Sequence, residues 1–193
     1  RRQTQAGRGP WRQHQGDATG GPAAGRIHSG TDGADLLRIG NGFDVHAFDE
    51  GDVITLGGVR IPYHRGLRAH SDGDVVLHAL CDALLGAIGE GDIGVHFPDS
   101  DPRWSGADSR MFLRHVTGTV HGRGFDVANA DLTVVAQSPR LRPFMDEMRA
   151  NVAADLQVDR SQVNLKATTT EGLGFAGRSE GVAAFAVVLL LAR

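Results

Sequence analysis

The stretch Gly42-Phe43-Asp44-Val45-His46 constrains the fold most, because polar and apolar side chains alternate along it. Side chains at positions i and i+2 of an extended strand point to the same face. The stretch therefore predicts a β-strand that carries Asp44 and His46 on one face and turns Phe43 and Val45 into a core.

A third candidate ligand, His78, lies in residues 74–88, whose apolar side chains recur at helical spacing. An Asp/His/His set with an open fourth position is typical of a catalytic zinc site. A strand-end carboxylate that only hydrogen-bonds a nearby histidine would also explain Asp44 and His46, and these two residues alone favour that simpler interpretation.

The predicted helix carries a polar stripe, because Asp74, His78 and Asp82 follow one another in steps of four residues. Such a stripe is usually the solvated face of a helix. If His78 binds a metal, Asp82 is a candidate to orient its second ring nitrogen.

Composition restricts the class of protein. The 193 residues are 40% hydrophobic with a net charge of −3, which fits one domain. Basic residues are balanced by acidic ones, which does not favour a nucleic-acid binder. The single cysteine, Cys81, excludes an internal disulfide. No apolar run approaches the ~20 residues that span a bilayer, and the run 182–192 predicts a buried strand.

Residues 1–37 differ from the rest, with repeated Gly, Arg, Gln and Ala and no hydrophobic period. They predict a disordered tail or linker, which leaves 38–193 as the single folded domain. Since the chain begins with Arg1, a fragment, a processed form and a longer polypeptide all remain open. A linker from an upstream domain is one such origin. Acidic residues in the tail make a transit peptide the weaker interpretation. We expect a cytoplasmic protein, or one in a plastid-type organelle if the tail is a transit peptide.

The folded part predicts both strands and helices. Strands are expected at 38–46, 127–136, 163–169 and 181–191, with a hairpin over 53–61 around Gly57-Gly58. Helices are expected at 74–88, 108–122 and from about 143 to 156. Residues 89–102 are too rich in turn formers for a regular element. Without strict βαβ alternation, the fold class is α+β, a single domain of a mixed β-sheet packed with helices.

Several loops carry groups suited to phosphate. Backbone amides near Ser71 and Gly73 at a helix start suit an anion. The hydroxyls of 168–170 are donors, and Glu171 offers a carboxylate to a hard cation such as Mg²⁺. Phosphate oxygens could be neutralised by Arg140, Arg142 and Arg178. With no P-loop and no dinucleotide-binding GxGxxG motif, the sequence favours a metal-assisted site for a phosphorylated ligand.

Five motifs follow one another along the chain. They are Gly42-Phe43-Asp44-Val45-His46; Ala69-His70-Ser71-Asp72-Gly73-Asp74 with His78; Gly91-Asp92-Ile93-Gly94; Phe97-Pro98-Asp99-Ser100-Asp101-Pro102; and Lys166-Ala167-Thr168-Thr169-Thr170-Glu171 with Gly174-Phe175. In residue types and spacing they resemble the 2-C-methyl-D-erythritol 2,4-cyclodiphosphate synthase family, from about residue 38 to the C-terminus. Asn41 stands where that family commonly has His, and Ser100 where it commonly has Thr; neither is expected to bind metal.

The resemblance implies roles for individual residues. Asp44, His46 and His78 match the ligands of zinc or another divalent transition metal, and Glu171 matches a ligand of a second cation, Mg²⁺ or Mn²⁺. His70 and Thr169 match positions that stabilise the transition state. Matches to substrate contacts are Ser71, Asp92, Ile93, Gly94, Phe97, Pro98, Asp99, Ser100, Asp101, Phe175 and Arg178. Matches on the cytidine and diphosphate side are Ala136, Gln137, Ser138, Pro139, Arg140, Leu141, Arg142, Ala167, Thr168 and Thr170.

The resemblance also implies an activity. A phosphorus-oxygen lyase of this family converts 4-diphosphocytidyl-2-C-methyl-D-erythritol 2-phosphate to the cyclic diphosphate and releases CMP, in non-mevalonate isoprenoid precursor biosynthesis. It is a homotrimer with active sites between subunits, and its partner is a small cytidine diphosphate substrate, with no nucleic acid and no membrane. Two other classes remain: a zinc-dependent phosphohydrolase that uses a metal-bound water, and a non-catalytic trimeric binding protein with structural zinc.

Overall fold

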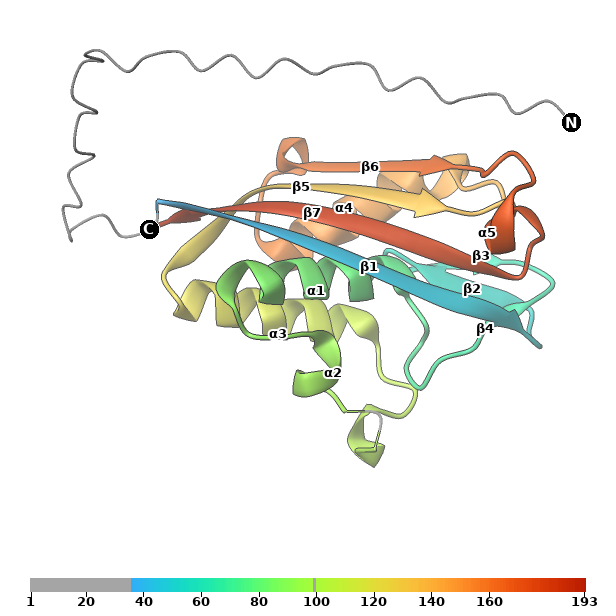
Figure 1. The fold of residues 1–193 in the computed structure, drawn as a ribbon, viewed down its shortest axis with the longest axis horizontal. Coiled ribbons are helices and arrows are strands. Elements are labelled where there is room, and N and C mark those ends of the chain that lie inside the picture. Colours follow the sequence, from blue (N-terminus) through green and yellow to red (C-terminus); the bar gives the residue numbers. More distant parts are fainter. Residues whose placement is uncertain (1–35, 99) are drawn as a thin grey trace, which may run out of the picture. The chain divides into compact units, whose positions relative to one another are not determined.

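The computed structural model describes residues 36–98 and 100–193. Its main body is a five-stranded sheet in the order β4-β1-β7-β5-β6 (Figure 1). The pairs β1–β4, β1–β7 and β5–β7 are antiparallel, whereas β5 and β6 run parallel, so the sheet is mixed. The strands are β1 (Leu37–Asp49), β4 (Gly66–Leu67), β5 (Phe125–Val135), β6 (Val163–Thr168) and β7 (Gly181–Ala192).

Helices cover one face of this sheet. The long ones are α1 (Val75–Ile88), α3 (Ser109–Gly122) and α4 (Met145–Leu156), and the short ones are α2 (Ile93–His96) and α5 (Gly174–Gly177). Single 3₁₀ turns occur at η1 (Pro102–Trp104), η2 (Arg142–Phe144) and η3 (Arg160–Gln162). Helix α1 packs on β1 and β7, α3 packs on α1, and α4 packs on β6 (Figure 1).

Two glycines let α1 lie directly on the backbone of β1. A Cβ atom on Gly40 would meet the carbonyl oxygen of Ala83 at 1.8 Å, and one on Gly42 would meet that of Ala79 at 1.9 Å. Both distances are far shorter than any real contact, so only glycine fits. The helix-facing positions of β1 therefore continue from Gly40 and Gly42 to Asp44 and His46, directly beside His78 on α1.

A two-stranded hairpin, β2 (Val53–Leu56) with β3 (Val59–Pro62), packs at the start of α1. Its turn residues, Gly57 and Gly58, have φ values of +56° and +70°, as a type I′ turn requires. The fully buried carboxylate of Asp74 accepts hydrogen bonds from both turn amides at 2.9 and 2.6 Å. It also accepts from the amides of Val76 and Leu77 as the N-cap of α1. One side chain thus joins the hairpin to the helix.

The face of β1 and β7 that points away from the helices is apolar and exposed. Phe43 is 47% exposed, Val45 43% and Phe185 44%, and the rings of Phe43 and Phe185 lie 4.8 Å apart across the two strands. Ile39, Val187 and Leu191 extend the same surface. The prediction that Phe43 and Val45 enter the core is therefore wrong within one chain: the alternation is real, but the buried face is the one that carries Asp44 and His46.

The α+β fold class predicted from the sequence is confirmed, and the predicted helices and hairpin match the observed ones to within two residues. The prediction that residues 89–102 lack a regular element is wrong in one respect, because α2 and the first 3₁₀ turn lie there. Leu37, assigned to the tail, is the first residue of β1.

The predicted tail or linker, with its transit-peptide alternative, falls largely on residues 1–35, which lie outside the described residues. In the part of the chain that the structure describes, no helix has the length and apolar character needed to cross a membrane.

Candidate metal centre and active site

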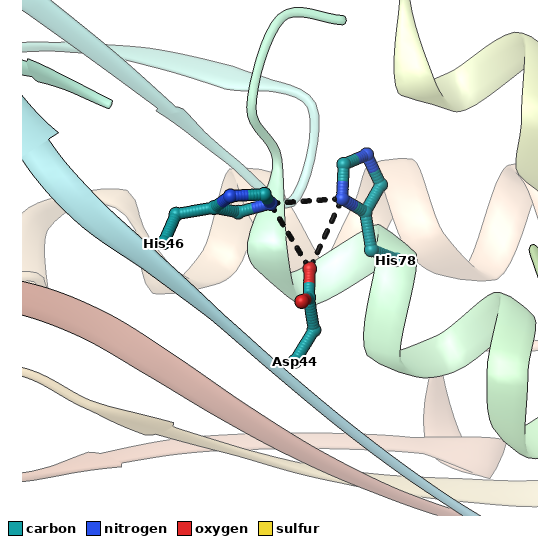
Figure 2. A group of neighbouring side chains, drawn as sticks. All are labelled: Asp44, His46 and His78. Carbon is teal, nitrogen blue, oxygen red and sulfur yellow. Dashed lines mark hydrogen bonds and ion pairs between the residues drawn. The ribbon is translucent and has the colours of Figure 1, made fainter. Parts of the chain in front are cut away.

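Three side chains from two elements converge at the junction of β1 and α1. The distance from Asp44 Oδ2 to His46 Nε2 is 3.0 Å and to His78 Nδ1 is 3.1 Å, and the two nitrogens lie 3.0 Å apart. Figure 2 shows these atoms pointing towards one another. Within residues 36–98 and 100–193, this is the one group of three His, Cys, Asp or Glu side chains with all ligand atoms within 4.8 Å of one another.

The hydrogen bonds around the triad fit a cation at its centre. His46 Nδ1 lies 3.1 Å from the carbonyl oxygen of Arg68, which can only accept, so Nδ1 carries the hydrogen and the neutral ring presents a lone pair on Nε2. That lone pair faces the carboxylate of Asp44. A proton on His46 Nε2 would make one hydrogen bond within the triad. A metal ion between Asp44 Oδ2, His46 Nε2 and His78 Nδ1 would contact all three atoms. Carboxylate oxygen and imidazole nitrogen are typical ligands of Zn²⁺ and of other divalent transition metals. The donor set is therefore consistent with a divalent metal.

The ionisation of the triad follows the same electrostatics. Burial alone would raise the pKa of Asp44, but hydrogen bonds and charge from His46 and His78 outweigh it and hold the pKa of this carboxyl far below its usual value. Burial alone would lower the pKa of His46, but the hydrogen bond and charge of Asp44, together with the Arg68 carbonyl, raise it above 6.5. The site therefore favours positive charge between these groups.

The second ring nitrogen of His78 points away from the triad, towards two hydroxyls. Nε2 lies 2.9 Å from Ser109 Oγ, at the start of α3, and 3.2 Å from Ser71 Oγ. Asp82, the residue proposed from the helical stripe for this role, instead accepts a hydrogen bond from the amide of Ile93 at 2.8 Å. The Asp82 interpretation is therefore corrected: this carboxylate anchors the start of α2.

A pocket of about 580 Å³ opens beside the triad. Eight of the residues predicted from the sequence line it: Asp44, His46, His70, Ser71, His78, Ile93, Gly94 and Phe97. The rings of Phe97, Trp104 and Phe112 pack edge to face or tilted and form an apolar wall. The pocket thus combines a metal-binding corner with an apolar side.

The other described residues predicted in 92–101, namely Asp92, Pro98, Ser100 and Asp101, are not part of the pocket lining. Asp92 caps α2 by accepting from the amide of Val95 at 3.0 Å. Asp101 caps the 3₁₀ turn and forms an ion pair with Arg103 at 2.5 Å. Pro98 and Ser100 are exposed, and Asp99 lies outside the described residues. Within the chain itself, Asp92 and Asp101 therefore act as caps of short helical turns.

A second pocket, of about 590 Å³, lies where β5 and β6 end. Nine predicted residues line it: Ala136, Gln137, Pro139, Arg140, Leu141, Arg142, Ala167, Thr168 and Thr169. Lys166 also lines it, and its ammonium group is held 2.5 Å from the carboxylate of Asp131. The pocket therefore presents four basic side chains, Arg140, Arg142, Arg149 and Lys166, and one acidic side chain, Asp146, among small and apolar ones.

Besides the residues of 92–101 named above, five further predicted residues among those described belong to neither pocket lining. Thr170 closes the turn after β6 by donating from Oγ1 to the carbonyl oxygen of Leu173. Glu171 accepts from Thr169 Oγ1 at 2.7 Å, and Arg178 forms an ion pair with Glu180 at 2.8 Å. Phe175 and Ser138 complete the set, Phe175 being exposed and Ser138 half-buried.

Sequence reasoning did not single out several residues that line the two pockets or contact the triad. Arg68, Trp104 and Phe112 line the first pocket, and Met145, Asp146 and Arg149 line the second. Ser109 was also missed, because a serine at a helix start is expected to cap the helix. Here Asp108 is the cap, and the Ser109 hydroxyl is left to face His78.

The chain is similar to known proteins over most of its length. The model of the YgbB family matches residues 37–191. The chain is 64% identical over 155 residues to the 2-C-methyl-D-erythritol 2,4-cyclodiphosphate synthase of Pseudomonas fluorescens, covering 80% of this chain and 99% of that protein. The chain also resembles IspF of Plasmodium falciparum in its CDP complex, with a TM-score of 0.71 and 35% identity over 81% of this chain and 97% of that one.

The structure of the bifunctional IspDF from Campylobacter jejuni is similar as well, with a TM-score of 0.78 and 47% identity. The match covers 81% of this chain but 42% of that protein, so the chain spans less than half the length of the bifunctional relative. Since the family model matches residues 37–191 and the Pseudomonas fluorescens protein is 64% identical over 99% of its length, this protein belongs to the YgbB family.

Proposed function

We propose that this protein is a 2-C-methyl-D-erythritol 2,4-cyclodiphosphate synthase. It converts 4-diphosphocytidyl-2-C-methyl-D-erythritol 2-phosphate to the cyclic diphosphate with release of CMP. The observation that carries the proposal is the convergence of Asp44, His46 and His78 within 3.1 Å at the wall of a pocket, in a chain 64% identical to synthases of that name.

The metal of this site is zinc in our proposal, held by Asp44 Oδ2, His46 Nε2 and His78 Nδ1. When bound, it would supply positive charge to a phosphate oxygen of the substrate. The nucleophile is already part of the substrate, because its 2-phosphate is largely ionised near neutral pH. No protein base is therefore needed, and the chain contributes by holding two anionic groups together.

The bond changes are a simple exchange at one phosphorus atom. An oxygen of the 2-phosphate forms a bond to the β-phosphorus, the bond from that phosphorus to the CMP oxygen breaks, and CMP leaves with the electron pair. His70 and Ser71 line the pocket beside the triad, where they can donate to the phosphate oxygens. In the second pocket, Arg140, Arg142 and Lys166 would offset the charge of the substrate's diphosphate and then of the phosphate on the departing CMP.

A second cation, Mg²⁺ or Mn²⁺, is proposed at Glu171. This carboxylate is exposed beside Thr169 in the turn after β6. Mg²⁺ commonly takes only one or two protein carboxylates and completes its shell with water and substrate phosphates. One glutamate next to a diphosphate subsite is therefore a sufficient protein contribution.

We propose that the protein is a homotrimer with active sites between subunits. Strand β6, which ends at the second pocket, is separated from β1 by β7 and β5, a spacing of roughly 14 Å across the sheet. The two pockets are thus apart within one chain. The exposed apolar face of β1 and β7 is the surface that neighbouring copies would cover, which lets the metal pocket of one subunit meet the cytidine pocket of the next.

Product analysis of a metal-site variant tests the activity. Asp44→Asn should lose zinc and cyclisation together, because an amide oxygen replaces the charged ligand, while the protein remains a folded trimer. The wild-type protein should release CMP and cyclic diphosphate in equal amounts. A linear phosphate product would instead indicate the phosphohydrolase, and CMP release at the normal rate without zinc would contradict the metal's role.

Mixing two inactive variants tests the shared sites. Asp44→Asn damages the metal pocket, and Ala167→Phe fills the cytidine pocket that Ala167 lines. In trimers assembled at random from equal amounts, about a quarter of the sites combine an intact metal pocket with an intact cytidine pocket of the neighbour. Recovery of about that share of activity is expected, whereas sites contained within one chain would give none.

A further inference from the structure

The buried hydroxyl of Ser109 connects the metal centre to a carboxylate that has no role so far. Ser109 has no exposed surface, and its Oγ lies 2.5 Å from Asp72 Oδ1 and 2.9 Å from His78 Nε2. The Ser109 backbone amide donates to the other oxygen of the same carboxylate at 3.3 Å. Asp72 lies in the loop before α1, and its amide donates to the carbonyl oxygen of Ala107. The first residue of α3 is therefore hydrogen-bonded to both carboxylate oxygens of Asp72 in this loop.

The direction of this hydrogen-bond chain follows from the chemistry of its ends. An ionised carboxylate only accepts, so Ser109 must donate its one hydrogen to Asp72. Ser109 Oγ can then only accept from His78, which requires the hydrogen of the imidazole on Nε2. In the neutral ring the lone pair is thereby left on Nδ1. Without a metal, the Asp44 carboxylate 3.1 Å away would accept a hydrogen from Nδ1, so Ser109 and Asp72 work against that alternative tautomer.

Ser71, the other hydroxyl near His78 Nε2, does not require the ring hydrogen to be on that nitrogen. Ser71 Oγ is farther away, at 3.2 Å, and accepts from the amide of Gly73, a contact that leaves its own hydrogen able to turn towards a ring nitrogen. No carboxylate fixes its direction in the hydrogen bonds described for it. Ser109 thus differs from Ser71 because the Asp72 carboxylate fixes the direction of its hydrogen bond.

We propose that Ser109 and Asp72 are positioning residues that fix the tautomer and orientation of His78, so that Nδ1 is available to a divalent metal. The proposal rests on the metal site of the proposed function. It assigns a role to Asp72 in the loop after His70-Ser71, and to the first residue of α3. Outer hydrogen-bond partners of metal-binding histidines commonly act in this way, and their loss typically weakens metal binding 10–100-fold.

The tautomer can be observed in the metal-free protein. With ¹⁵N-labelled histidine and excess chelator, long-range ¹H–¹⁵N correlation should find the His78 hydrogen on Nε2 in the wild type. Ser109→Ala should move a substantial part of the population to the Nδ1–H form, and its zinc affinity in competition with a chelator should fall 10–100-fold. Ser109→Thr keeps the hydroxyl and should restore both measurements towards wild type.

A buried hydroxyl elsewhere on α3 provides the control. Thr117 is fully buried, and its Oγ1 has no hydrogen-bond partner in the described part of the chain. Thr117→Val should change neither the tautomer of His78 nor zinc affinity, even if it alters stability. Asp72→Ala should reproduce the effect of Ser109→Ala, because the serine is then free to reverse its hydrogen.

The outcomes separate this proposal from the proposed function. An unchanged tautomer and unchanged zinc affinity in both Ser109→Ala and Asp72→Ala would overturn the positioning role while leaving the synthase proposal intact. A wild-type protein that binds no zinc and forms no cyclic product would instead overturn the proposed function. In that case the metal-free spectra would still show whether Ser109 and Asp72 set the tautomer of His78.

Discussion

At the scale of single residues, the raised pKa of His46 makes the stability of the metal-free protein depend on pH. Asp44 favours the protonated ring in the folded state, whereas the ring titrates near 6.5 when unfolded. The folded state therefore binds more protons than the unfolded state at pH values between these two pKa values. The stabilisation from this pair is fully present below about pH 6.5 and is lost as the pH rises through the folded pKa.

Removing and restoring zinc should reverse this dependence. In excess chelator, the free energy of unfolding should fall as the pH rises above 6.5. With saturating zinc it should rise instead, because the metal binds the deprotonated rings of the folded protein. Urea unfolding at a series of pH values, with and without zinc, measures both slopes. His46→Gln is the control and should lose the zinc response; equal slopes with and without zinc in the wild type would contradict a metal at this site.

The residue types of the triad could be predicted from the sequence, but their surroundings could not. Two-residue spacing on a strand places Asp44 and His46 on one face, and the family motifs add His78. The four-residue step from His78 to Asp82 shows which residues share a helix face, and not what packs against that face. Ser109, 31 positions away in the chain, reaches His78 through the packing of α3 on α1, which no local pattern reveals.

At the scale of elements, the spacing between α1 and β1 is set by glycine. Gly42→Ala should destabilise the fold by about 2 kcal/mol or more, since its Cβ would overlap the carbonyl of Ala79 and the helix backbone cannot yield locally. Zinc affinity should fall as well, because His78 moves with the helix. Chemical denaturation and chelator competition measure the two effects.

Gly86 is the matched control on the same helix. It is exposed, and a Cβ there would meet nothing within 4 Å. Gly86→Ala should leave zinc affinity unchanged and stabilise the protein by about 0.5–1 kcal/mol, the usual gain at a helix interior. Similar destabilisation by both substitutions would show that close packing on β1 is not the cause.

The cap of α1 should contribute more than an ordinary cap. Asp74→Ala leaves the amides of Gly57 and Gly58 without their buried acceptor, in addition to the first turn of α1. We expect a loss of roughly 3 kcal/mol or more, because each buried unpaired donor costs about 1–3 kcal/mol. Asp108→Ala, at the exposed cap of α3, should cost only about 1 kcal/mol. Equal losses in thermal or urea unfolding would refute a separate contribution from the hairpin.

Elements with a strong local signal were predictable, and short ones held by tertiary contacts were not. Gly57-Gly58 between two β-branched runs predicts the hairpin, and the apolar spacing of 74–88 predicts α1. Strand β4 is only Gly66–Leu67 and exists through its pairing with the end of β1. Helix α2 is a single turn held by Asp92 and by Asp82 from α1. Such contacts leave no periodicity in the sequence.

At the scale of the whole molecule, the apolar face of β1 and β7 predicts self-association. Phe185→Asp places a charge at the centre of that face, next to Phe43. The variant should be a folded monomer of about 20.5 kDa without synthase activity, whereas the wild type should sediment at three times that mass. Analytical ultracentrifugation measures the difference.

Met111→Asp is the control for this substitution, because Met111 is an exposed apolar residue on α3, outside the β1–β7 face. It should leave the trimer and its activity intact. A trimeric Phe185→Asp protein would contradict the proposed interface. The alternation in β1 could not have told a core from a subunit contact, since both need an apolar face; only the exposure of Phe43 and Val45 distinguishes them.

The glycines of β1 have a further consequence for how freely this protein can vary. On one side of the strand, Gly40 and Gly42 admit no side chain, and Asp44 and His46 belong to the candidate metal centre. On the other side, Ile39, Phe43 and Val45 form the surface on which copies would meet. Seven of the thirteen residues of β1 are therefore constrained on one face or the other. Random substitutions should therefore be lost from these seven positions faster than from the exposed face of α3.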